Sequence, residues 1–197
     1  AFWDCGNNGV TTTLCVSTEE KFGKAVPAAK LASMNMFVLA AGNLFTGSFN
    51  YASFTGTVDF GRKYAWTARP SALKLKYTAT VGAMVRTSGD VLEGVAKGDP
   101  DNARIFVAIV DWTAPHQVVS GMTTTEGAWD PVKANTVAEG KIIGYGSLTI
   151  PASESDAADA ALKDTELQIY WYDKTAKPAE GNYSLVISCA CNAYGDF

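Results

Sequence analysis

Residues 41–70 read AGNLFTGSFNYASFTGTVDFGRKYAWTARP, and this stretch decides the fold. Within it, residues 54–60 alternate aromatic, aliphatic or glycine positions with threonine and aspartate. A period of two residues indicates a β-strand with one face against a core and the other in water. A glycine-containing turn precedes this strand, and a turn with Trp66 between Arg62 and Arg69 follows it. The stretch therefore predicts antiparallel β-structure with an aromatic ring and two arginines in a loop between strands.

Further strands are expected on both sides of this stretch. Residues 73–81 alternate apolar side chains with lysine and threonine, which is the clearest two-residue period in the chain. Residues 105–110 are apolar on both faces, so they predict a central strand. Residues 141–150 predict another strand, in which Gly144 and Gly146 indicate a bend or a close approach of a second segment of backbone.

Two more segments complete the expected elements. Residues 28–39 are interpreted as one long strand with both faces partly covered. Residues 152–162 are rich in alanine and acidic side chains, with Ser153 or Ser155 as N-caps, and give the one helix expected. Since strand follows strand without intervening helices, the sequence predicts an all-β, antiparallel jelly-roll β-sandwich with one short helix and long end loops.

Composition sets limits on function. The chain has 197 residues, which fits a single domain over 1–197, and 47% of them are hydrophobic. The net charge is −4 and the pI is about 5, and no basic block is present, which argues against nucleic-acid binding. No apolar run reaches the ~18 residues that span a bilayer. The chain starts at Ala1 without a signal-like stretch. Either the protein is cytosolic or, as we prefer, the chain is mature or trimmed material of an exported protein.

Four cysteines leave two interpretations open. They are small buried apolar residues, or Cys5 and Cys15 form a disulfide across the turn-rich segment between them. Cys189 and Cys191 lie two apart in an expected strand, so they face the same side and are poorly placed to bond each other. Zinc is disfavoured because these spacings match no zinc pattern and His116 is far away in sequence.

Several blocks resemble a bacterial family, the putative carbohydrate metabolism domain. They are Trp3 with Gly6-Asn7, residues 41–49 with 54–56, residues 59–62 with 69–77, residues 105–112, and residues 188–196. The resemblance implies a fold like that of carbohydrate-binding modules, located at the C-terminus of secreted or surface lipoproteins of glycan-consuming bacteria.

The chain departs from this resemblance at its end. Family members continue past the Tyr-Gly-Asp turn into a final strand, whereas this sequence stops at Phe197. The domain is therefore expected to lack its final strand and to belong to a larger surface protein. An exposed sheet edge beyond Phe197 is expected, which a strand from a protein partner could complete.

Glycan recognition needs flat aromatic surfaces and polar groups at fixed positions. Two tryptophans are the least explained by packing in the core and are therefore predicted to contact the ligand. They are Trp66, between Arg62 and Arg69, and Trp129, beside Asp130 in a long loop. The alternative is that both rings pack on their own loops. Tyr170 and Tyr172 share one face of an expected strand and are predicted to form a stacking strip, with Trp171 on the opposite, core face.

Metal and catalytic sites are less well supported. Asp99, Asp101 and Asn102 form an oxygen-rich loop that predicts calcium, although ordinary turn chemistry is the simpler account. A glycosidase needs two carboxyl groups across a sugar. The acidic candidates are Asp59, Asp111, Glu126 and Asp130, and no motif pairs them.

The sequence therefore predicts non-catalytic binding of a glycan or glycoconjugate on the outer surface of a bacterial cell. One rival is a glycoside hydrolase that acts through a carboxylate pair. A second rival is a structural or adhesive module that is completed by a partner's strand. Calcium is the only cofactor expected.

Overall fold

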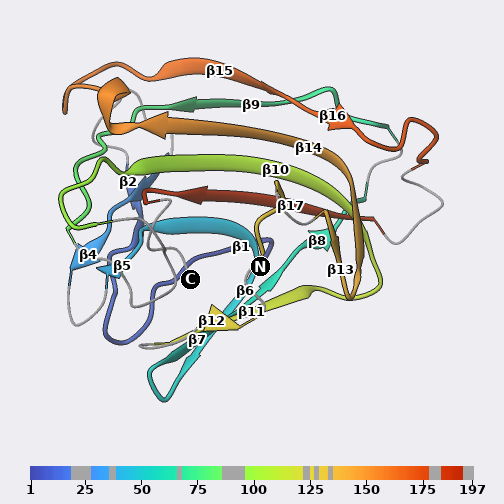
Figure 1. Ribbon diagram of the computed structural model, residues 1–197, viewed down its shortest axis with the longest axis horizontal. Helices are drawn as coiled ribbons and strands as arrows, with labels where there is room; N and C mark the ends of the chain where they lie inside the picture. The colour runs from blue at the N-terminus through green and yellow to red at the C-terminus, as the bar shows by residue number, and fades with distance from the viewer. Residues whose placement is uncertain are drawn as a thin grey trace.

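The computed structural model describes residues 1–18, 28–35, 39–65, 68–85, 96–121, 125–126, 129–132, 135–177 and 183–192. These residues form antiparallel sheets with a single turn of 3₁₀ helix (Figure 1). The prediction of an all-β antiparallel sandwich is confirmed, while the jelly-roll connectivity stays a prediction. No helix in these ranges is long and apolar enough to cross a membrane.

Most strands are short, and four of them reach eight residues or more. The elements are β1 (Trp3–Asp4), β2 (Cys15–Thr18), β3 (Ala28–Leu31), β4 (Met34–Asn35), β5 (Leu39–Ala40), β6 (Asn43–Ala52), β7 (Thr55–Phe60), β8 (Arg62–Lys63), β9 (Ala72–Tyr77), β10 (Asn102–Trp112), β11 (His116–Gly121), β12 (Thr125–Glu126), β13 (Thr136–Val137), β14 (Gly140–Pro151), the 3₁₀ turn η2 (Ala152–Glu154), β15 (Lys163–Gln168), β16 (Tyr170–Trp171) and β17 (Tyr183–Ala190).

One large sheet organises the molecule. Its strand order is β12-β11-β7-β6-β17-β10-β14-β13, and β1, β8 and β16 pair with β6, β17 and β14. Three two-stranded sheets, β15–β9, β2–β3 and β4–β5, complete the fold. As the apolar sequence of residues 105–110 predicts, β10 is central, with β14 on one side and β17 on the other (Figure 1).

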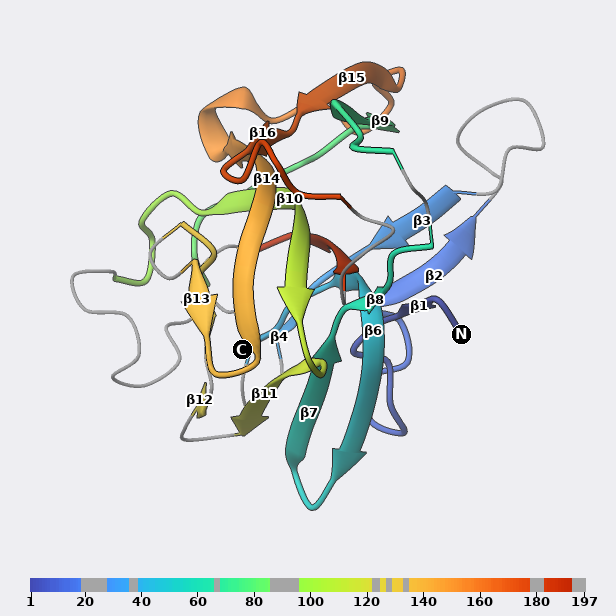
Figure 2. The ribbon, with the colours of Figure 1, turned by 90° about the vertical axis from the view of Figure 1, so that its right-hand side faces the viewer.

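Both faces of β10 are buried, because its side chains alternate between separate clusters. Phe106, Ala108 and Val110 contribute to one core with residues of β6, β7 and β11. Ile105 and Val107 contribute to a second core, which the apolar faces of β9 and β15 cover. The large sheet therefore packs β7 and β11 against one of its own faces, while β9 and β15 lie over the other (Figure 2).

Two sequence predictions are wrong in detail. The long strand expected over residues 28–39 is divided among β3, β4 and β5, because β4 and β5 pair antiparallel with each other instead of continuing one strand. The helix expected over residues 152–162 is reduced to η2. The residues that follow η2 form polar contacts with Ala79, Thr80 and Val81, in the segment after β9, instead of continuing a helix.

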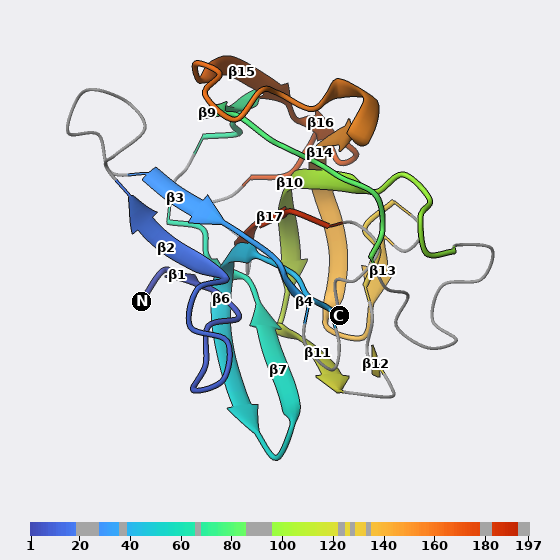
Figure 3. The same cartoon turned by 90° about the vertical axis from the view of Figure 1, so that its left-hand side faces the viewer.

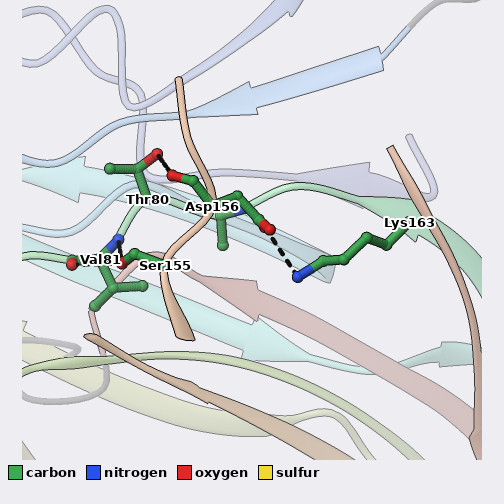
Figure 4. A network of polar contacts seen from close by, with 6 residues as sticks. Thr80, Val81, Ser155, Asp156 and Lys163 are labelled. Carbon is green, nitrogen blue, oxygen red and sulfur yellow. Dashed lines mark hydrogen bonds and ion pairs between the residues drawn. The ribbon is translucent and has the colours of Figure 1, made fainter. Parts of the chain in front are cut away.

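Those contacts tie the segment after β9 to the start of β15 (Figure 4). Ser155 Oγ accepts a hydrogen bond from Val81 N at 2.7 Å, and the carbonyl of Asp156 accepts one from Thr80 Oγ1 at 3.2 Å. The Asp156 carboxylate lies 2.9 Å from Lys163 Nζ at the start of β15. The segment after η2 therefore joins the two outer strands to each other.

Phe54 occupies a different position from the one its alternation predicts. It sits with Ser53 in the two-residue turn of the β6–β7 hairpin, with φ values of 63° and 51°. Consecutive positive φ values match the twist of a two-residue hairpin, although a non-glycine residue adopts them only with strain. As a result, the Phe54 ring projects from the tip and is 71% exposed.

Candidate functional site

The structure describes one of the two tryptophans that the sequence predicts to bind a ligand. Trp66 lies outside the described residues. Trp129 is only 8% exposed, and its ring contacts Phe60, Phe106, Trp112 and His116 at centroid distances of 5.0–6.0 Å. The structure therefore favours the packing role for Trp129, since no flat face of this ring is open to a sugar.

The two predicted arginines bind backbone carbonyls. Arg62 donates from Nη2 to the carbonyl of Gly47, which ties β8 to β6. Arg69 donates from Nη1 to the carbonyl of Lys174, and its guanidinium lies 5.9 Å from the centroid of the Trp171 ring. Arg69 remains solvent-exposed next to β16, whereas Arg62 is partly buried.

The side chains of residues 170–172 alternate as the sequence predicts. Tyr170 is 72% exposed and Tyr172 is 58% exposed. Trp171 packs inward against the second core and donates from Nε1 to the carbonyl of Pro70 at 2.9 Å. Two aromatic rings are therefore open to solvent on one side of this segment, and a third ring anchors it.

Two glycines of β14 bring this segment close to the sheet. A Cβ added at Gly146 would lie 2.2 Å from the carbonyl oxygen of Gln168, and one at Gly144 would lie 3.3 Å from the Trp171 ring. Only a residue without a side chain permits the first approach. The close backbone contact that the sequence predicts at these glycines is confirmed at Gly146, and it positions Tyr170 beside β14.

Tyr170 pairs with Tyr145 of β14, so the two side chains lie on the same face of the sheet. The Tyr145 hydroxyl accepts a hydrogen bond from Arg104 Nη2 at 3.0 Å, and the same nitrogen lies 3.4 Å from Asp130 Oδ1. A chain of contacts thus connects two residues that the sequence singles out, Tyr170 and Asp130, through the unpredicted Arg104 and Tyr145.

Ser147 and Thr149 extend this surface. They follow Tyr145 at two-residue intervals along β14, and both are exposed. We call the combined surface the Tyr170 face, and its residues are Arg104, Asp130, Tyr145, Ser147, Thr149 and Tyr170. It combines one open aromatic ring with a cation, a carboxylate and two hydroxyl groups, which are the groups that hold a polyhydroxylated ligand.

His116 belongs to a separate, buried arrangement. Its Nδ1 lies 2.9 Å from Glu139 Oε2, and its ring packs against Trp112 and Trp129. Burial raises the pKa of the Glu139 carboxyl. The hydrogen bonds from His116 and from the backbone, together with the charge of His116, outweigh that effect, so the pKa lies below its ordinary value.

This pair predicts a pH-dependent contribution to stability. The pKa of Glu139 is lower in the folded chain than in the unfolded chain, so ionised Glu139 stabilises the fold. This stabilisation is fully present above the unfolded-state pKa and is lost as the pH falls through the folded-state pKa. Glu139→Gln is therefore expected to destabilise the protein at neutral pH, and the difference from wild type is expected to shrink as the pH falls through the folded pKa. Urea midpoints measured across this range test it. Glu154→Gln, at an exposed glutamate, serves as the control. If the urea midpoint of Glu139→Gln depends on pH as that of wild type does, the pair makes no such contribution to stability.

One protein family matches the chain over residues 1–197, and its description is "Putative carbohydrate metabolism domain". The chain belongs to this family. The family resemblance seen in the sequence is therefore confirmed, and it connects this carbohydrate metabolism domain to carbohydrate-related function. Among proteins with curated descriptions, none matches the chain.

Two solved structures share the fold of this carbohydrate metabolism domain. One is described as a putative glycoside hydrolase from Bacteroides vulgatus, with 18% identity, a TM-score of 0.62, and coverage of 96% of this chain and 76% of that one. The other is described as a putative glycoside hydrolase from Bacteroides thetaiotaomicron, with 18% identity, a TM-score of 0.60, and coverage of 98% and 57%. At this identity the likeness shows the fold alone.

The carboxylates considered for catalysis have separate partners in this domain. Asp59 Oδ1 accepts a hydrogen bond from Gln117 at 2.8 Å, Asp130 contacts Arg104, and Asp111 lies opposite Lys141 in the β10–β14 pairing. The Glu126 side chain lies outside the described residues. Within the described part, no recorded contact brings two of these carboxylates together.

The residues of the predicted calcium loop bind protein groups. Asp101 is fully buried, and its carboxylate accepts hydrogen bonds from Asn102 N and Asn192 Nδ2. Asp99 Oδ2 accepts one from Ala96 N at 2.8 Å. Among the described residues, no group of three or more His, Cys, Asp or Glu side chains is placed to hold a metal ion. Calcium stays a prediction.

Proposed function

We propose that the Tyr170 face binds a glycan or glycoconjugate without catalysing a reaction on it. The observation that carries the proposal is the Tyr170 ring, 72% exposed, on the same face as the Arg104–Asp130 pair. The Tyr170 ring adds little to stability in this position, because an aromatic side chain contributes about 1.5–3 kcal/mol only when it is buried.

The face is chemically suited to a sugar. The apolar C–H side of a pyranose can lie flat on an exposed tyrosine ring, while its hydroxyls exchange hydrogen bonds with charged and hydroxyl side chains. Arg104 donates and Asp130 accepts, so the pair can serve both hydrogen-bonding roles of one hydroxyl group. Tyr172 supplies a second exposed ring two residues further on, which would extend the contact along a longer chain of sugars.

The family and the two neighbouring structures support a carbohydrate ligand. Binding is favoured over hydrolysis because hydrolysis needs two carboxyl groups about 5–10 Å apart across the sugar. Asp130, the carboxylate of the Tyr170 face, instead contacts a cation. We further propose that the domain acts on the outer surface of a bacterial cell, because polymeric glycans are met outside the membrane.

A glycan array tests this proposal. The purified chain, Tyr170→Ala and Phe54→Ala are screened against host, plant and microbial glycans, with calcium and with a chelator. Phe54 is the matched control, because it is an aromatic residue that is equally exposed on the remote hairpin tip. We expect Tyr170→Ala to weaken binding at least ~10-fold, equivalent to about 1.4 kcal/mol, and Phe54→Ala to leave it unchanged, with both variants folded by circular dichroism.

Other outcomes would separate the rivals. Full binding by Tyr170→Ala would refute the assignment of the face. Shortened glycans in the reaction products, lost on replacing a carboxylate, would favour the hydrolase. If the wild-type chain binds none of the glycans, the structural or adhesive module becomes the better account. Loss of binding only in the chelator would support the calcium prediction.

A further inference from the structure

The cation of the Tyr170 face is held in place by the sheet beneath it. Arg104 belongs to β10, which pairs with β14, and β14 in turn pairs with β16 (Figure 3). The Arg104 guanidinium lies 5.6 Å from the centroid of the Phe106 ring, two residues further along β10. Phe106 is buried in the first core, so the guanidinium rests on a ring that cannot move away. Its position relative to Tyr170 is therefore set by the fold.

One nitrogen of this guanidinium makes both of its hydrogen bonds to the protein. Arg104 Nη2 donates to the Tyr145 hydroxyl at 3.0 Å and to Asp130 Oδ1 at 3.4 Å. A carboxylate binds arginine most strongly through two parallel hydrogen bonds from a fork of two nitrogens. A guanidinium has two such forks, Nη1 with Nη2 and Nε with Nη2, and Nη2 belongs to both. Because Nη2 already serves two protein acceptors, neither fork is complete for the carboxylate of a ligand.

The polar atoms that remain suit hydroxyl groups. The N–H groups of Arg104 Nε and Nη1 have no partner among the described residues. Asp130 Oδ1 accepts from Arg104 and also from Val132 N, at 2.9 Å, whereas Oδ2 has no partner in the same part of the chain. A sugar hydroxyl both donates and accepts, so neighbouring hydroxyls can accept from the arginine and donate to Oδ2.

The charges of the pair disfavour an anionic ligand. Arg104 and Asp130 neutralise each other, and the whole chain carries a net charge of −4. A second carboxylate that approached the guanidinium would also approach Asp130, and like charges at such short range repel. The side chains of Arg104 and Asp130 are 26% and 36% exposed. A ligand can therefore reach them, but partial burial leaves the repulsion less screened by salt than it is on an open surface.

We propose that the Tyr170 face selects neutral glycans, and that Asp130 is the residue that excludes acidic ones, such as glycans of uronic acids or sulfated sugars. The inference rests on the proposed glycan binding and adds the class of sugar. Asp130 acts in two ways, because it occupies Nη2 of Arg104 and places a negative charge where an acidic group would bind. Asp130→Asn removes the charge, and the amide oxygen can still accept from Val132 N.

An array of neutral hexose oligomers and of uronic-acid and sulfated oligomers tests the selectivity, at low and at high salt. Wild type should bind neutral glycans only. Asp130→Asn should bind acidic glycans at least ~10-fold more tightly than wild type does, and high salt should reduce this gain. Asp130→Glu keeps the charge and should still exclude acidic glycans. Asp164→Asn is the matched control, because Asp164 forms an ion pair with Lys76 at 3.2 Å near the start of β15, outside the Tyr170 face. This control should bind as wild type does.

Tyr170→Ala separates failure of the selectivity from failure of the proposed function. If wild type binds acidic glycans as tightly as neutral ones, and Tyr170→Ala loses both, the face binds glycans but the selectivity is refuted. The selectivity is also refuted if Asp130→Asn gains no affinity for acidic glycans, or if Asp164→Asn gains as much. If wild type binds no glycan, or Tyr170→Ala binds as wild type does, the proposed function fails and this inference fails with it.

Discussion

Trp129→Ala is expected to lower the free energy of unfolding by about 3–5 kcal/mol. The ring is almost fully buried and touches four other rings. Its removal would leave a cavity next to Phe106 of the central strand. It would also remove edge-to-face contacts with Phe106 and Trp112, each contributing about 0.5–1.5 kcal/mol beyond area burial.

Urea unfolding of wild type, Trp129→Ala and Phe54→Ala measures this effect. Phe54→Ala should change stability by less than about 0.5 kcal/mol, because its ring is exposed and touches little. A stable Trp129→Ala variant that has lost glycan binding would contradict the structural role and restore the ligand-binding role that the sequence proposes for this tryptophan.

Gly146→Val is expected to destabilise the protein by about 3 kcal/mol and to weaken glycan binding at the same time. The first atom of any side chain would lie 2.2 Å from the carbonyl oxygen of Gln168. Both partners are backbone, so neither can swing aside. The segment that carries Tyr170 would have to separate from β14, and the Tyr170 ring would move relative to Arg104.

Gly82 provides the control for this variant. A Cβ at Gly82 meets nothing within 4 Å, so Gly82→Val should leave both stability and binding nearly unchanged. Differential scanning calorimetry reports the first property and glycan titration the second. If Gly146→Val is as stable as wild type, the close approach of the Gln168 carbonyl to Gly146 does not constrain the site.

The strands that position the site are predictable because they obey a local rule. Alternation with a period of two residues predicts β7 and β9, and an apolar run predicts the central β10. The failures arise where long-range contacts outweigh local preference. Ser155 and Asp156 accept hydrogen bonds from the segment after β9 instead of continuing a helix. Phe54 is drawn into a tight turn by the register of the β6–β7 hairpin.

The same distinction applies to the site. The exposure of Tyr170 and Tyr172 follows from the alternation around Trp171, so the sequence suffices to predict it. Arg104 and Tyr145 could not be found this way, because 41 residues separate them and only the β10–β14 register brings them together. The single available signal for Arg104 is a cation at the beginning of an apolar strand. The burial of Trp129 depends on rings from several strands, which no local pattern encodes.

A crystal structure of the chain with the strongest glycan from the array would show whether the Tyr170 face binds sugar. We expect a sugar ring lying flat on Tyr170, with its hydroxyls within hydrogen-bonding distance of Arg104 and Asp130, and no second carboxylate across the glycosidic bond. A glycan bound elsewhere with the Tyr170 face empty, or held between two carboxylates, would contradict it.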